Sequence, residues 1–158
     1  MTSALVNKTI RFKVITPVYS KMTIEEELPE YLTSRTRISS SQEVYHLFRH
    51  LVKLPREVFY CLHLDSKNRI ICLDTVSQGS LTASIVHPRE LFSGVILSAA
   101  AAIILVHQHP SGDPTPSRED IEITQRIHDG AKLLGIRLLD HIVIGEEQYV
   151  SFTDRGLL

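Results

Sequence analysis

Apolar and polar positions along the chain fall into the short periods typical of β-strands. Residues 57–64 divide into two alternating sets of side chains, and residues 69–76 follow after a turn-forming segment, so the two predict a hairpin. The run from Ala99 to Val106 is apolar throughout, which is typical of a strand buried on both faces. Further strands are predicted over residues 81–86, 136–144 and 149–152.

Three other segments have the three- and four-residue spacing of an amphipathic helix. The first follows a capping serine, Ser40, and ends before Pro55. The second opens at Pro88, and the third runs from Asp120 to a left-handed cap at Gly135. The positions predicted to face the core in the second and third helices are Leu91, Phe92, Val95, Ile96 and Ala99, and Ile121, Ile127, Ala131 and Leu134.

The predicted hairpin carries both cysteines of the chain, Cys61 and Cys72. A two-residue turn at Ser66-Lys67 places them opposite each other. We interpret them as a pair of buried thiols rather than a disulfide, because the expected compartment is reducing. A second turn is predicted at residues 77–80.

The order of these elements predicts an α/β sandwich around one mixed sheet. With 158 residues, the chain is long enough for one such domain and too short for two. We assign that domain to residues 39–158. Within residues 1–38, the alternation over residues 9–15 is consistent with one partly exposed strand, and the acidic piece at residues 25–29 has little core-forming content. We interpret residues 1–38 as an arm that packs on the domain or on a partner chain, which would permit a homodimer.

Composition narrows the classes of function. A net charge of −1 gives no electrostatic support for nucleic-acid binding, and the 43% hydrophobic content is ordinary for a soluble globular protein. No apolar run approaches the roughly 20 residues of a membrane span, and the first residues lack the pattern of a secretory signal. We therefore expect a cytoplasmic protein without a membrane segment.

The candidate chemistry lies where the buried strand ends. His107 and His109 are separated by one residue on an extended backbone, so their side chains point to the same side. Two imidazoles in this arrangement suit a tetrahedral Zn²⁺, and a catalytic zinc typically takes a third protein ligand and leaves the fourth position to water. Asp120 is the candidate third ligand, because the proline-rich loop before it can fold back over the histidines.

The other candidate residues also have ordinary structural interpretations. Ser117 and Asp120 form a Ser-x-x-Asp helix start, in which they would serve as an N-cap and as an acid that complements the helix dipole. A hydrolytic zinc site needs a general base, and Glu57, at the head of a strand, is the candidate. Spacing alone leaves open that Glu57 is a plain exposed acid.

The candidate residues resemble known families at two levels, a broad signature and a narrower family. The residues that resemble the JAMM (MPN+) metalloprotease signature are Glu57, His107, His109, Ser117 and Asp120. More narrowly, the stretches 106–113 and 139–145 resemble the bacterial RadC family, and the match extends over about residues 39–158.

This resemblance implies a cytidine-deaminase-like α/β/α sandwich, the JAB/MPN domain, with zinc held by His107, His109 and Asp120. It also implies that Glu57 is the base for the zinc-bound water. Ser117 would donate a hydrogen bond to the oxyanion of the tetrahedral intermediate.

Two features depart from the family pattern. RadC proteins usually have asparagine where this chain has Gln108, a residue that we expect to point away from the metal. Full-length members also carry an N-terminal helix-hairpin-helix region associated with DNA. With only the arm 1–38 in its place, this chain resembles the short forms found on mobile elements and prophages.

We predict a zinc-dependent metallohydrolase, a JAMM-type peptidase or isopeptidase that cleaves an amide bond in a peptide or protein. The alternatives are a RadC-type DNA repair or recombination accessory, or mobile-element protein, without peptidase activity, and a binding module whose metal is structural. Outside the motif, we interpret His63 as structural, and Asp140 and His141 as packing or outer-sphere hydrogen-bonding residues.

Overall fold

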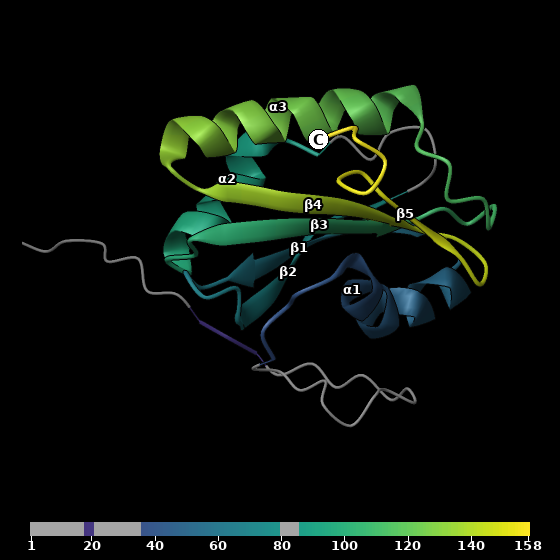
Figure 1. Ribbon diagram of the computed structural model, residues 1–158, viewed down its shortest axis with the longest axis horizontal. Helices are drawn as coiled ribbons and strands as arrows, with labels where there is room; N and C mark the ends of the chain where they lie inside the picture. The colour runs from purple at the N-terminus through teal and green to yellow at the C-terminus, as the bar shows by residue number, and fades with distance from the viewer. Residues whose placement is uncertain (1–17, 21–35, 80–85) are drawn as a thin grey trace, which may run out of the picture.

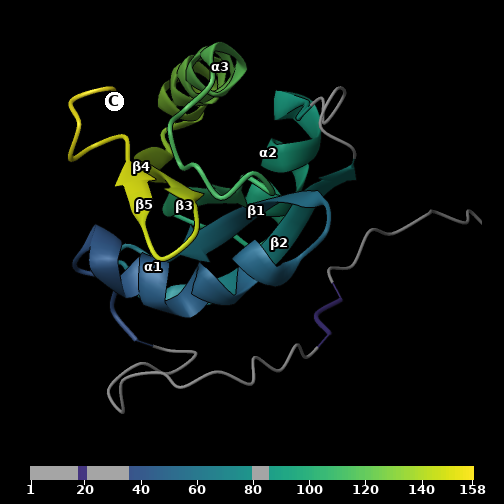
Figure 2. The same cartoon turned by 90° about the vertical axis from the view of Figure 1, so that its right-hand side faces the viewer.

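The computed structural model describes residues 18–20, 36–79 and 86–158. A mixed sheet lies between two layers of helices (Figures 1 and 2). The helices are α1 (Ser41–Phe48), the 3₁₀ helix η1 (Arg49–Lys53), α2 (Pro88–Leu97) and α3 (Arg118–Leu134). The strands are β1 (Glu57–Leu64), β2 (Ile70–Gly79), β3 (Ala102–Gln108), β4 (Arg137–Ile144) and β5 (Tyr149–Ser151).

The strands of the sheet follow the order β2-β1-β3-β4-β5. β1 is antiparallel to both β2 and β3, while β3 and β4 are parallel because α3 returns the chain to the same end of the sheet. β4 and β5 are antiparallel. The predicted α/β fold around one mixed sheet is therefore confirmed.

Side chains of β3 alternate between two hydrophobic cores. Ile104 and Val106 face the core under α1 and η1, whereas Ile103 and Leu105 face the core under α2 and α3. Every residue of β3 is buried, as the unbroken apolar run predicted. Because the alternation continues along the strand, His107 lies on the α3 side of the sheet.

The faces of α2 and α3 were predicted only in part. Ile127 and Ala131 are buried as expected, but Ile96, Ile121 and Leu134 are 60%, 43% and 46% exposed. The residues of α3 that are buried at the sheet are Asp120, Thr124, Ile127 and Ala131. Two polar residues therefore occupy positions where the prediction looked for apolar ones, and the true inward stripe is rotated away from Ile121. Ala99, also assigned to the face of α2, lies beyond the end of that helix with a positive φ of 54°.

The register of the hairpin was predicted incorrectly. Cys61 pairs with Asp74 and Cys72 with His63, two residues away from the predicted register. One residue comes from a longer turn, which places Leu64 opposite Ile70, and the other from the irregularity between His63 and Leu64. Both cysteines are free thiols, as expected, although Cys72 is only partly buried. The turn predicted at residues 77–80 is also wrong for residues 77–79, because β2 continues through them to Gly79.

Several predictions fall largely on residues that are not described. They include the strand at 81–86, apart from Val86, and most of the arm 1–38. At the end of that arm, Arg37 forms an antiparallel bridge with Arg69 beside the start of β2. Among the described residues, no helix is both long and apolar enough to cross a membrane.

Candidate metal centre

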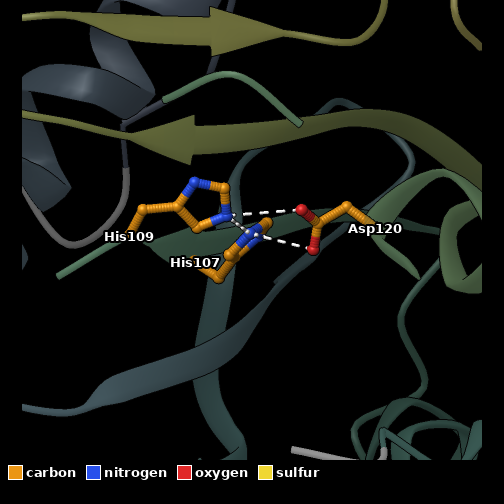
Figure 3. Close-up of side chains that lie close together, drawn as sticks. All are labelled: His107, His109 and Asp120. Carbon is orange, nitrogen blue, oxygen red and sulfur yellow. Dashed lines mark hydrogen bonds and ion pairs between the residues drawn. The ribbon is translucent and has the colours of Figure 1, made fainter. Parts of the chain in front are cut away.

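The predicted ligands converge at the carboxyl end of β3. His107 is the penultimate residue of this strand, His109 follows the strand, and Asp120 lies in the first turn of α3. Figure 3 shows the three side chains pointing toward one another, with the carboxylate of Asp120 facing both imidazoles. The loop between His109 and α3 folds back over the strand end, as the sequence predicted.

Three short distances define the centre. The Nε2 atoms of His107 and His109 are 3.0 Å apart. Oδ1 of Asp120 lies 3.1 Å from Nε2 of His107, and Oδ2 lies 3.3 Å from Nε2 of His109. Ligands at about 2.0–2.1 Å from a tetrahedral ion are separated by about 3.3 Å, so these atoms need almost no movement to hold one metal ion.

A buried hydrogen-bond relay fixes the tautomer of His107. Thr124 donates its only hydroxyl proton to the main-chain oxygen of Asp120, so Nδ1–H of His141 must donate to Oγ1 of Thr124, at 2.6 Å. Nε2 of His141 is then an acceptor, and Nδ1–H of His107 donates to it at 2.8 Å. Nε2 of His107 is left as a bare lone pair that faces the centre.

The tautomer of His109 is fixed in a similar way by the loop. Its Nδ1 lies 2.7 Å from the main-chain oxygen of Asp113, which can only accept, so this nitrogen carries the proton. The loop is held in turn by two main-chain bonds, from His109 N–H to Ile144 and from Glu146 N–H to Gly112. Nε2 of His109 is therefore the second bare lone pair at the centre.

The close contacts at the centre shift the pKa values of Asp120, His109 and His141. Burial alone would raise the pKa of Asp120, but the hydrogen bonds that this carboxylate accepts when the facing Nε2 atoms carry protons in place of a metal ion hold that pKa well below its ordinary value. The hydrogen bond to Asp120 raises the pKa of His109 against the opposing effect of burial, and the charge of Glu57 adds to the rise. Burial, reinforced by repulsion from His107, lowers the pKa of His141 and keeps it neutral in the relay.

These observations test whether a metal ion fits. Two imidazole lone pairs and a carboxylate face one another within hydrogen-bond distance, an arrangement that requires a cation or added protons between them. Among the described residues, this is the only group in which three ligand atoms from His, Cys, Asp or Glu come together so closely. The donor set therefore fits a metal ion.

Ser117 and Asp120 form the helix cap that the sequence suggested, in addition to their place at the centre. Oγ of Ser117 accepts from the Asp120 N–H, and Oδ2 of Asp120 accepts from both the main-chain N–H and the hydroxyl of Ser117. The hydroxyl proton therefore points to the metal-facing carboxylate in this structure. A role at an oxyanion requires the hydroxyl to turn, and that role stays a prediction.

Glu57 begins β1, two residues before Phe59. Phe59 pairs with His107 across the sheet, and the two rings stack with their centroids 5.6 Å apart. Continuing this antiparallel register by two residues in each strand places Glu57 opposite His109, on the same face as the centre. Glu57 is also close enough for its charge to raise the pKa of His109.

Other predicted residues separate clearly into two roles. His141 is an outer-sphere partner of His107, as one of the two sequence interpretations held. Asp140, its neighbour, faces away and accepts hydrogen bonds from Ser151 and Thr153. These bonds anchor the end of the chain so that Phe152 stacks on His141, with ring centroids 4.7 Å apart.

Three contacts were not predicted from the sequence. Thr124 completes the relay, the carbonyl of Asp113 orients His109, and Gln108, which points away from the centre as expected, binds the start of β1 with its buried side chain. A signal existed for Thr124 alone, because it lies one helical turn after Asp120 on the same face.

Comparisons with known proteins agree with this arrangement. The chain matches the family described as RadC-like JAB domain over residues 38–157. It is 54% identical over 123 residues to a UPF0758 protein of Syntrophotalea carbinolica, which is 77% of this chain and 54% of that protein. It is 52% identical over 126 residues to a UPF0758 protein of Geotalea uraniireducens (79% and 55%) and 50% identical over 125 residues to one of Methanosarcina mazei (78% and 55%).

The chain thus spans about half the length of the curated relatives it matches. The name that these relatives carry states no activity. The family match covers the strand end, the loop and the helix start that form the centre, together with both residues of the relay. The chain belongs to the RadC-like JAB domain family.

Proposed function

We propose that this protein is a zinc-dependent hydrolase of amide bonds, a peptidase or isopeptidase acting on a peptide or protein. The observation that carries the proposal is the donor set itself. Two imidazoles and one carboxylate converge, and no fourth protein ligand joins them among the described residues. Three protein ligands with an open position are typical of catalytic zinc, whereas structural zinc normally has four.

In this proposal, different residues orient the metal ligands and supply the negative charge that holds the ion. The relay through His141 keeps the lone pair of His107 directed at the centre, and the carbonyl of Asp113 does the same for His109. Asp120 supplies the negative charge, held in place by Ser117. A zinc ion in such a site supplies Lewis acidity toward a carbonyl oxygen and makes a water acidic enough to attack it at neutral pH.

In this proposal, Glu57 moves the proton. The strand register, extended to bring Glu57 opposite His109, supports a carboxylate beside the open side of the centre, where it would take a proton from the attacking water. The same carboxyl group can then donate that proton to the leaving amine, so the amide bond breaks without release of a free amide anion. Amide hydrolysis needs both transfers, and one residue in this position can perform both.

The test compares two glutamates in the full chain loaded with zinc. Glu57→Gln should keep its metal, measured by atomic absorption, and lose roughly 10²–10⁴-fold in kcat on fluorogenic peptide and isopeptide substrates. Glu119→Gln, which changes an exposed acid next to the ligand Asp120, is the matched control and should keep wild-type activity. Full activity in Glu57→Gln, or a wild-type protein that binds zinc and hydrolyses no amide substrate, would contradict the proposal.

A further inference from the structure

Gln108 lies between the two histidine ligands but faces the opposite side of the sheet. It is fully buried, and a buried primary amide must find partners for both its oxygen and its nitrogen. Both partners belong to the start of β1. Oε1 accepts a hydrogen bond from Val58 N–H at 3.0 Å, and Nε2 donates to the main-chain oxygen of Arg56.

These two partners flank Glu57 in the sequence. In an extended strand, the main-chain groups of residues i and i+2 point to the same edge, so Arg56 and Val58 both face β3. The paired register of β1 and β3 ends at Phe59 and His107, and the next N–H on this edge of β1, that of Val58, bonds to the side chain of Gln108 instead of to a main-chain oxygen. Beyond the last main-chain pair, the side chain of Gln108 supplies the hydrogen bonds that hold β1 to β3.

The other edge of Glu57 is held by β2. Glu57 pairs with Gly79, and Val58 with Gln78. The backbone of Glu57 is therefore fixed from both sides, by a regular ladder on one side and by one amide side chain on the other. By strand alternation from Phe59, its side chain falls on the face of the sheet that carries the candidate centre.

We propose that Gln108 is a positioning residue that holds Glu57 at its working distance from the metal ion. The inference rests on the proposed function, because it takes Glu57 as the group that moves the proton. A proton-transfer group must stay within hydrogen-bond reach of the reacting water, and a displacement of about 1 Å can cost roughly 100-fold in rate. The residue between the two ligands thereby links the metal-binding strand to the base.

The experiment uses the zinc-loaded full chain with two substitutions. Gln108→Leu removes both hydrogen bonds at similar volume, and we expect kcat to fall roughly 100-fold while zinc content and KM stay near wild type. Gln108→Glu keeps an acceptor for Val58 N–H and loses the donor to Arg56. Its kcat should therefore lie between that of the wild type and that of Gln108→Leu. Gln78→Leu makes the same change at an exposed position opposite Val58 and should leave kcat unchanged.

A second readout does not depend on turnover. Hydrogen exchange of the Val58 amide, followed by NMR on ¹⁵N-labelled zinc-loaded protein, should be slow in the wild type and at least tenfold faster in Gln108→Leu. The amide of Leu62, in the middle of β1, should not change. Because Gln108→Glu retains the Val58 bond, its Val58 amide should stay protected even though its kcat falls.

Three results would overturn the inference. They are unchanged Val58 exchange in Gln108→Leu, wild-type kcat in that variant, and loss of zinc together with activity, which would place the effect of Gln108 on the metal instead of on Glu57. A wild-type protein that hydrolyses no amide would refute the proposed function alone. The exchange data would still decide whether Gln108 holds the strand that carries Glu57.

Discussion

Two buried histidines on the same face of the sheet, His107 and His63, belong to hydrogen-bond networks that differ in completeness. In the network of His107, every proton and every lone pair has a defined partner or points to one common centre. The chain of donors runs from His107 through His141 to Thr124 and ends on a main-chain carbonyl. Asp120 supplies the negative charge at the other side.

The network of His63 stops short. Ser98 donates its hydroxyl proton to Val95, so Nδ1–H of His63 must donate to Oγ of Ser98, at 2.8 Å. Sγ of Cys72 lies 3.3 Å from the same nitrogen. Nε2 of His63 is buried and has no hydrogen-bond partner among the described residues.

The difference shows what distinguishes the candidate metal centre from the other buried histidine. Burial and an available lone pair are common to both histidines. Only at His107 do a second lone pair and a carboxylate converge on the same point, at 3.0–3.3 Å from one another. Convergence beside an anion, more than burial or the number of histidines, therefore separates the candidate centre from the structural histidine.

Removing one ligand should give the largest effect. His109→Ala deletes one of the three donors, and its metal content should fall from near one equivalent to near zero, measured by atomic absorption after dialysis. His63→Leu is the matched control from the incomplete network and should retain the wild-type equivalent. Metal content near wild type in His109→Ala would place the ion elsewhere.

A change in the relay should have a smaller effect. Thr124→Val keeps the shape of the side chain but removes the acceptor for Nδ1–H of His141, so the tautomer of His107 is no longer fixed. Outer-sphere changes of this kind typically weaken metal binding by roughly 10–100-fold, which competition with a chromogenic chelator would detect. Thr75→Val, at an exposed position on β2, should bind metal as the wild type does. Equal affinity in both variants would show that the relay has no role in metal binding.

The sequence predicted the convergence of the three candidate ligands because their chemistry coincides with local geometry. An extended strand end aligns His107 with His109, and a helix cap presents Asp120, so spacing alone brings these groups together. The hairpin register was wrong by two residues. The turn, in which Asp65 accepts from two main-chain N–H groups, is one residue longer than predicted, and the irregularity between His63 and Leu64 adds the second.

The contributors that sequence reasoning missed act across the fold. Gln108 reaches Arg56 and Val58 on another strand, and no spacing in the sequence indicates that contact. Thr124 was missed for a different reason, because the helical face was assigned from apolar residues alone. Counting one turn from Asp120 would have placed Thr124 on the buried side, between the ligand and Ile127.

The smallest expected effect is on the titration of the metal-free protein. The networks of His107 and His63 shift histidine pKa values in opposite directions. The hydrogen bond to Asp120 raises the pKa of His109 above the ordinary 6.5, whereas burial lowers the pKa of His63 below it, although Asp74 partly opposes this. His109 should therefore stabilise the apo protein below pH 6.5 and lose that contribution as pH rises through its raised pKa. His63 should have the opposite effect: because its pKa is lowered in the folded state, it should reduce the stability of the apo protein as pH falls below 6.5.

NMR of the imidazole Cε1–H signals in chelator-treated protein would measure both pKa values, with His109→Ala and His63→Leu used to assign the two resonances. Asp120→Asn should bring the pKa of His109 back toward the ordinary value and leave that of His63 unchanged. Since a metal ion must displace the proton from His109, metal affinity should also weaken as pH falls through the raised pKa of this residue. If both histidines titrate on the same side of 6.5, the carboxylate of Asp120 does not control the centre, and the distinction between the two networks fails.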